Sequence, residues 1–144
     1  MLRYTSTLES AYSEALERLM FFNPGQHAAL EAIMDSVDTF GAPSVFDDAG
    51  RLRIKVEKLD EVQALYALDD DVLVGVLVFY RVSLERLTVI HIAVDHEYSS
   101  QGEFAQSMLV MRMLELLRSN ARRIKGVETI RILCSGNQVR DYPV

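Results

Sequence analysis

Cysteine, tryptophan and proline are scarce in this sequence: its 144 residues include one cysteine, no tryptophan and three prolines. The single Cys134 cannot form an internal disulfide, which fits a protein of a reducing compartment. The sequence has no run of about 18 apolar residues that could cross a membrane, and its opening, MLRYTSTLES, has no apolar core of an export signal. We therefore expect a cytoplasmic protein that does not enter a membrane.

Positive charge is also in short supply. Lys and Arg number 15 against 21 Asp and Glu, which gives a formal net charge of −6. A protein that grips nucleic acid needs a basic stripe to neutralise phosphates. The one basic cluster falls in the last turns of a predicted helix, where it complements the helix dipole: Arg118, Arg122, Arg123 and Lys125. We expect no nucleic-acid partner.

The composition is typical of a globular protein, with 49% apolar and 25% charged residues, and the length suits one domain. We expect residues 1–144 to form a single domain whose N-terminal segment, residues 1–42, is helical. Apolar residues at helical spacing predict a first helix that ends at the NPG of residues 23–25. The same spacing predicts a second helix from about Gln26 to Phe40.

The remaining segment, residues 43–144, changes to the two-residue period of strands. RLRIKVEKL alternates charged and apolar residues, and VLVGVLVFYRVS is apolar on both faces, as expected of a central strand. The predicted strands cover 51–59, 61–68, 72–83, 86–95 and 127–134. A long helix from about Glu103 to Ile124 lies between the last two. This order predicts an α+β fold, with two N-terminal helices followed by a mixed, mostly antiparallel sheet of about five strands and a crossover helix.

Several segments from Val62 to Tyr142 occur in the order known from one protein family. LVGVLVF contains Gly75, IAVDHEY ends a strand, SSQGEF leads to the long helix, and IRILCSGNQVRDY contains Asn137. Together they resemble the acyl-CoA-binding region of the GNAT acyltransferase superfamily, and the sequence is identified as a degenerate, C-terminally short member. The resemblance implies a GNAT-like fold and an acyl-transfer activity. In that reaction an amine directly attacks the thioester of acetyl-CoA or another acyl-CoA.

The resemblance also implies which residues bind the acyl-CoA. In the family, two parallel strands splay apart at a bulge, and the freed backbone groups pair with the pantetheine arm. Loop amides then face the pyrophosphate at the helix N-terminus, where the dipole favours an anion. The implied residues here are Ile92, Ala93, Val94, Ser99, Ser100, Gln101, Gly102, Glu103, Phe104, Ala105 and Asn137. No metal is expected.

Two residues are candidates for proton transfer. The resemblance implies that Tyr142 protonates the leaving thiolate. His91 is a candidate base, yet simple alternation turns it away from the face of Thr88 and Ile90 unless a bulge resets the register. A structural histidine and a catalytic base both remain open interpretations.

Two functions from different classes remain open. The first is an acyl-CoA-dependent N-acyltransferase with a small-molecule or protein amine as acceptor. The second is an inactive GNAT-fold binding or regulatory module, which we expect to be a homodimer. Ser99 and Phe104 stand where the family has Gln or Arg and Gly or Ala, and these departures favour the second function. The surviving Gly102, the IAVD segment and Asn137 favour the first.

Overall fold

The computed structural model describes residues 1–21, 30–98, 102, 104–105, 108–133 and 139–144. Within these ranges, the large sheet has six strands in the order β1-β4-β5-β6-β7-β8, and β2 and β3 form a separate two-stranded sheet. The strands are β1 Leu2–Thr5, β2 Pro43–Asp48, β3 Arg51–Val56, β4 Gln63–Asp69, β5 Val72–Ser83, β6 Arg86–Val94, β7 Thr129–Leu133 and β8 Val139–Pro143. The helices are η1 Ser10–Tyr12, α1 Ser13–Phe21, α2 Leu30–Phe40, η3 His96–Tyr98 and α3 Leu109–Ala121.

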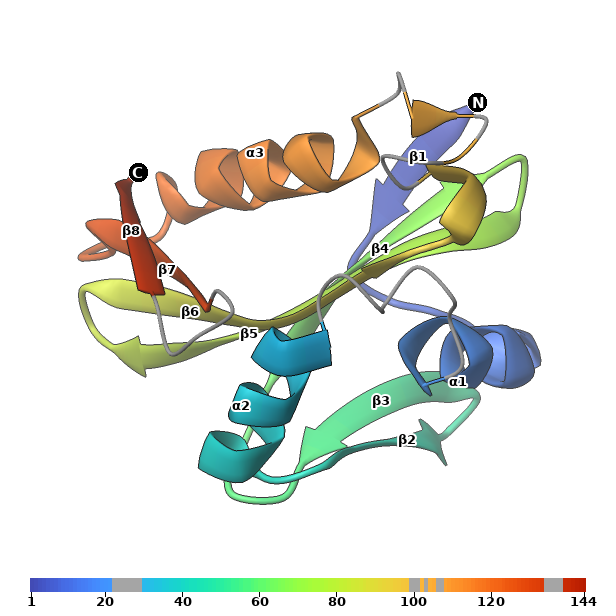
Figure 1. Cartoon of the computed structure of the whole chain (residues 1–144), viewed down its shortest axis with the longest axis horizontal. Helices are drawn as coiled ribbons and strands as arrows, with labels where there is room; N and C mark the ends of the chain where they lie inside the picture. The colour runs from blue at the N-terminus through green and yellow to red at the C-terminus, as the bar shows by residue number, and fades with distance from the viewer. Residues whose placement is uncertain (22–29, 99–101, 103, 106–107, 134–138) are drawn as a thin grey trace.

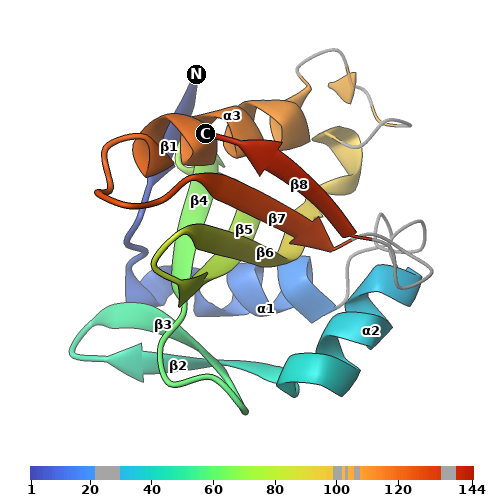
Figure 2. The ribbon, with the colours of Figure 1, turned by 90° about the vertical axis from the view of Figure 1, so that its left-hand side faces the viewer.

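The predicted α+β plan is confirmed. Strands β4, β5 and β6 form an antiparallel meander. Helix α3 lies in the connection from β6 to β7, and these two strands pair in parallel. Figure 1 shows α3 on one face of the sheet, with α1, α2 and the β2–β3 hairpin on the other. Figure 2 shows β6, β7 and β8 side by side between α3 and α2. No helix within the described ranges is long and apolar enough to cross a membrane.

Strand β5 is central because it is apolar on both faces. Val76 and Val78 pack into the core that includes α1 and β3, whereas Val74 and Leu77 pack into the core that includes α3. One sheet therefore separates two buried layers, and β5 contributes to both.

The prediction that two helices precede the whole sheet is wrong. Strand β1 comes first and pairs antiparallel with β4, so the N-terminal segment is not purely helical. The predicted strand 51–59 also exists only as β3, which pairs with the unpredicted β2 outside the main sheet. The unpredicted β8 adds an edge strand next to β7, and its residues are all exposed.

The long helix begins later than predicted, at Leu109 instead of Glu103. The backbone N–H of Phe104 donates to the carbonyl of Glu97, and that of Ala105 donates to the carbonyl of Gly102, so these residues belong to turns. Met108 precedes the helix in the left-handed conformation, with φ 52° and ψ 47°. An α-helix cannot continue backward through such a residue.

Candidate functional site

Strand β6 contains a bulge near its middle. Its partner β5 pairs Phe79 with Val89 and Val78 with His91, so Ile90 is an extra residue of β6. Val89 packs into the core on the α3 face, whereas Ile90 packs into the opposite core and lines a small cavity together with His91. The bulge therefore turns two consecutive side chains toward α2.

This register shift decides the orientation of His91. Simple alternation would place the side chains of Ile90 and His91 on opposite faces of the sheet. Because of the bulge, both lie on the same face. His91 is 8% exposed, and its Nε2 atom has no hydrogen-bond partner among the described residues. Burial lowers the pKa of His91 to about 4. A group with such a pKa is neutral at pH 7 and a weak general base, so its catalytic role stays a prediction.

Helix α2 contacts the bulge directly. The buried hydroxyl of Ser36 donates a 3.0 Å hydrogen bond to the carbonyl of Ile90. Ser36, Val37 and Gly41 line one side of the cavity that His91 borders, and its volume is about 10 Å³. A space of this size holds about one water molecule. The bond from Ser36 gives the carbonyl of Ile90, the extra residue of the bulge, a buried hydrogen-bond partner.

The described pairing between β6 and β7 reaches the same place. Within the described residues, the last pair of this parallel ladder is Val89 with Ile132, and Ile90 is the next residue along β6. The second half of β6, Ile92–Val94, continues to pair with β5. Ala93 faces the α1 core, while Ile92 and Val94 pack against the α3 core. The three residues predicted to bind a pantetheine arm thus lie together on β6, beyond its last pair with a described residue of β7.

The loop after β6 folds back on itself. Asp95 begins it by accepting the N–H of Glu97 on its carboxylate at 3.0 Å. The N–H of Phe104 donates to the carbonyl of Glu97 at 2.6 Å, and the rings of Tyr98 and Phe104 stack with centroids 5.0 Å apart. A Cβ atom on Gly102 would lie 2.2 Å from the carbonyl oxygen of His96, so only glycine fits this position.

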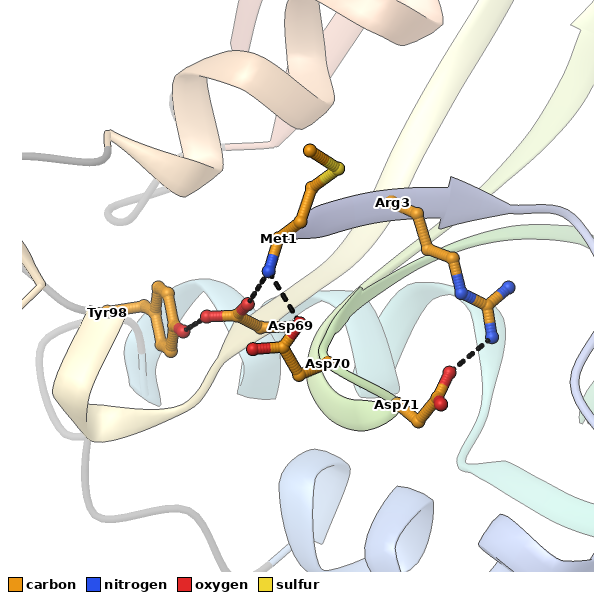
Figure 3. A network of polar contacts seen from close by, with 6 residues as sticks. All are labelled: Met1, Arg3, Asp69, Asp70, Asp71 and Tyr98. Carbon is orange, nitrogen blue, oxygen red and sulfur yellow. Dashed lines mark hydrogen bonds and ion pairs between the residues drawn. The ribbon is translucent and has the colours of Figure 1, made fainter.

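Tyr98 connects this loop to the β4–β5 turn, as Figure 3 shows. Its hydroxyl donates to Asp69, which also accepts from the amino group of Met1 at 2.9 Å. Asp70 accepts from the same amino group at 2.8 Å. Burial and the bond to Asp69 raise the pKa of Tyr98 to about 12, and the hydrogen bond from Tyr98 lowers the pKa of Asp69. At neutral pH the hydroxyl of Tyr98 therefore stays protonated and the carboxyl group of Asp69 stays ionised.

Tyr142 lies away from the predicted arm-binding residues. It is 41% exposed on β8 and pairs with Ile130 of β7, which in turn pairs with Leu87 near the start of β6. From Leu87 to Ile92, a strand advances on the order of 15 Å. The structure therefore brings His91 and Ile92–Val94 together on β6 and leaves Tyr142 apart from them.

Some of the remaining predicted site residues lie outside the described residues, and the others lie in the loop after β6. Ser99, Ser100, Gln101, Glu103 and Asn137 lie outside the described residues. Gly102, Phe104 and Ala105 lie in the loop, and the amides of Phe104 and Ala105 are bonded within it. Among the residues that the structure describes, no three His, Cys, Asp or Glu side chains are grouped to hold a metal.

Two contacts of the site were not predicted from the sequence. The sequence contained one signal for the contact of Ser36. This polar residue lies three residues after Ile33 and four before Phe40, within the apolar stripe of a predicted helix. The bond between Tyr98 and Asp69 had no sequence signal, because it joins η3 to the end of β4, which are distant in the sequence.

A larger cleft lies at the other end of the sheet. Its volume is about 570 Å³, and it forms where β5 extends past Gln63, the first residue of β4. Its lining residues are Lys58, Leu59, Asp60, Glu61, Gln63, Tyr80, Arg81, Leu87 and Ile124. None of the predicted site residues that the structure describes is among these lining residues.

No protein-family model and no curated protein matches the sequence. Among solved structures, the ribosomal-protein-S18-alanine N-acetyltransferase from Escherichia coli matches with a TM-score of 0.48 and 14% identity, over 92% of this chain and 66% of that chain. The IAA acetyltransferase from Bacillus cereus matches with a TM-score of 0.46 and 13% identity, over 92% of this chain and 65% of that chain. The chain therefore spans slightly less than two thirds of the length of each neighbour.

Proposed function

We propose that the chain is a GNAT-like N-acyltransferase domain that binds the pantetheine arm of acetyl-CoA or another acyl-CoA along the second half of β6. The proposal rests on one observation: the bulge at Ile90 directly follows Val89, the last residue of β6 with a partner among the described residues of β7. A strand that continues past its partner offers backbone donors and acceptors to an extended ligand, and the amide-rich pantetheine arm is such a ligand.

The proposed reaction depends on the orientation of the amine and the thioester more than on a specialised catalytic side chain. The nitrogen of the amine attacks the thioester carbonyl, the C–N bond forms and the C–S bond breaks, and the proton lost by nitrogen ends on the leaving thiolate. The transfer is not routed through Tyr142, because β8 holds it near the start of β6. His91 enters as a neutral imidazole, since its pKa is lowered to about 4.

An NMR titration of the full chain with acetyl-CoA tests the binding site. We expect the backbone amide signals of Ile92, Ala93 and Val94 to shift and saturate with micromolar to submillimolar acetyl-CoA. Signals of Gln63 and Tyr80, which line the distant cleft, are the internal control and should not move. Shifts confined to the distant cleft would contradict the proposed site. An assay of thiol release with a panel of amines then tests the transfer itself.

One observation favours a second candidate function, a binding or regulatory module that acts as a homodimer. The amides of Phe104 and Ala105, which the resemblance assigns to the pyrophosphate, already donate to carbonyls of their own loop. If no amide signal shifts with millimolar acetyl-CoA, the second function replaces the first. Sedimentation equilibrium would then test the dimer.

A further inference from the structure

The large cleft at the far end of the sheet has the size of a small-molecule site. Its volume is about 570 Å³, which falls within the roughly 300–1,000 Å³ typical of ligand sites. The cleft exists because β5 continues to Ser83, whereas β4 begins only at Gln63, which pairs with Phe79. Its lining residues come from the β5–β6 hairpin, the end of the α3 connection and residues 58–61, which lead into β4.

Part of this lining is apolar. Leu87 belongs to the core on the α3 face, and Ile124, which follows α3, is only partly covered at 36% exposure. Tyr80 and Leu59 pack against the core on the other face of the sheet. The cleft therefore follows the edge of β5 and is lined by side chains from both faces. An apolar group bound there loses contact with water on more than one side.

Arg81 provides a fixed cation in the cleft. Its Nη2 atom donates to the carbonyl of Leu84 at 2.6 Å and to the carbonyl of Lys125 at 3.0 Å. These two bonds join the β5–β6 turn to the turn after α3. A guanidinium group has five N–H donors, so three remain for a ligand. Because the two carbonyls already hold the side chain, binding a carboxylate costs little further conformational freedom.

The charged residues that line the cleft are balanced in sign. Lys58 and Arg81 are cationic, whereas Asp60 and Glu61 are anionic. Within the described ranges, none of the four forms an ion pair. A ligand with several charges of one sign, such as a phosphate ester or a polyamine, would face residues of its own sign here. A ligand with one positive and one negative charge has a partner for each.

We propose that this cleft binds an apolar α-amino acid in its zwitterionic form. The carboxylate of the ligand contacts Arg81, and its side chain packs on Leu87. Its ammonium group contacts Asp60 or Glu61. The site is separate from the proposed donor site, since a strand advances on the order of 15 Å from Leu87 to Ile92. The bound amino acid is therefore not the amine that attacks the thioester, and the inference does not depend on the proposed function.

An NMR titration of the full chain with three matched ligands tests the two charge contacts: L-leucine, N-acetyl-L-leucine and L-leucinamide. We expect L-leucine to shift the amide signals of Tyr80 and Arg81 with a dissociation constant on the order of 1 mM or below, while Ile92 stays unchanged. The other two ligands each lack one charge and should bind at least about threefold more weakly. Equal binding of either one, or no shift at Tyr80 and Arg81 with about 20 mM L-leucine, would overturn the inference.

Glycine tests the apolar contact, because it has both charges and no side chain. We expect it to bind at least about tenfold more weakly than L-leucine. Glycine binding as tightly as L-leucine would show that the apolar lining makes no contribution and would contradict the proposed ligand class.

The double variant Asp60→Asn/Glu61→Gln removes both candidate partners of the ammonium group. Both side chains are exposed and precede β4, so we expect the fold to be kept. L-leucine should bind at least about threefold more weakly to this variant, whereas N-acetyl-L-leucine, which has no ammonium group, should not be weakened. Glu17→Gln, at an exposed residue of α1, is the matched control and should change neither. Unchanged binding of L-leucine, or an equal loss for both ligands, would contradict the assigned contact.

Discussion

Burial of His91 makes the stability of the fold depend on pH. The side chain is 8% exposed, and burial lowers its pKa to about 4 from the ordinary value of 6.5. Below pH 6.5 the unfolded chain takes up a proton at this residue, while the folded chain stays neutral until the pH approaches 4. The unfolded state is therefore favoured progressively as the pH falls through this window.

The expected loss is about 3 kcal/mol of unfolding free energy between pH 7 and pH 4, since each unit of pKa difference corresponds to about 1.4 kcal/mol. Urea unfolding followed by circular dichroism across this range measures it. His91→Gln should show a flatter pH dependence than the wild type, because glutamine does not titrate. Equal pH dependence in the wild type and His91→Gln would disprove the argument.

Among elements, α3 has an unusual start. Met108 is its N-cap residue in the left-handed conformation, and no side chain caps the helix there. A non-glycine residue in this conformation costs on the order of 1 kcal/mol. The side chain of Met108 is 59% exposed, so little packing compensates for this strain.

Two glycine substitutions with opposite expected signs test this strain. Met108→Gly should raise the free energy of unfolding by about 1 kcal/mol, because glycine adopts the left-handed conformation without a steric penalty. Met111 is similarly exposed, at 58%, but lies inside α3. Met111→Gly should lower the free energy by about 1 kcal/mol. Thermal unfolding of both variants gives the comparison, and destabilisation of similar size in both would show that Met108 is not strained.

Element prediction from sequence succeeded where burial produced a regular pattern. Strand β5 has the predicted bounds, Val72–Ser83, because both of its faces are apolar. Strands β1 and β8 were missed because they are short, lie at the edges of the sheet and bury little of their surface. An edge strand is defined by its partner more than by its own residues.

The candidate site was only partly predictable, for a related reason. The position of Ile92–Val94 at the end of β6 follows from the strand pattern. The bulge at Ile90 does not, because the residues on both sides of it are buried and β6 shows no two-residue period there. The hydrogen bond from Ser36 is a tertiary contact between α2 and β6, so no local pattern contains it.

At the scale of the whole molecule, two cores share one sheet. Leu16 of α1 belongs to the core on one face and Met113 of α3 to the core on the other, and both are fully buried. Strand β5 contributes side chains to both cores, so neither layer can be lost without exposing one of its faces to water. This arrangement favours unfolding of both layers in one cooperative step.

Leu16→Ala and Met113→Ala therefore test the coupling from opposite faces. Each should lower the free energy of unfolding by about 2–5 kcal/mol, because each leaves a cavity in a packed core. Val72→Ala, at a side chain that is 62% exposed, is the control and should change stability by less than about 0.5 kcal/mol. Urea unfolding followed by circular dichroism, together with amide exchange of β5, should show one transition in both core variants. Two separate transitions, with α3 lost before α1 in Met113→Ala, would mean that β5 does not couple the two layers.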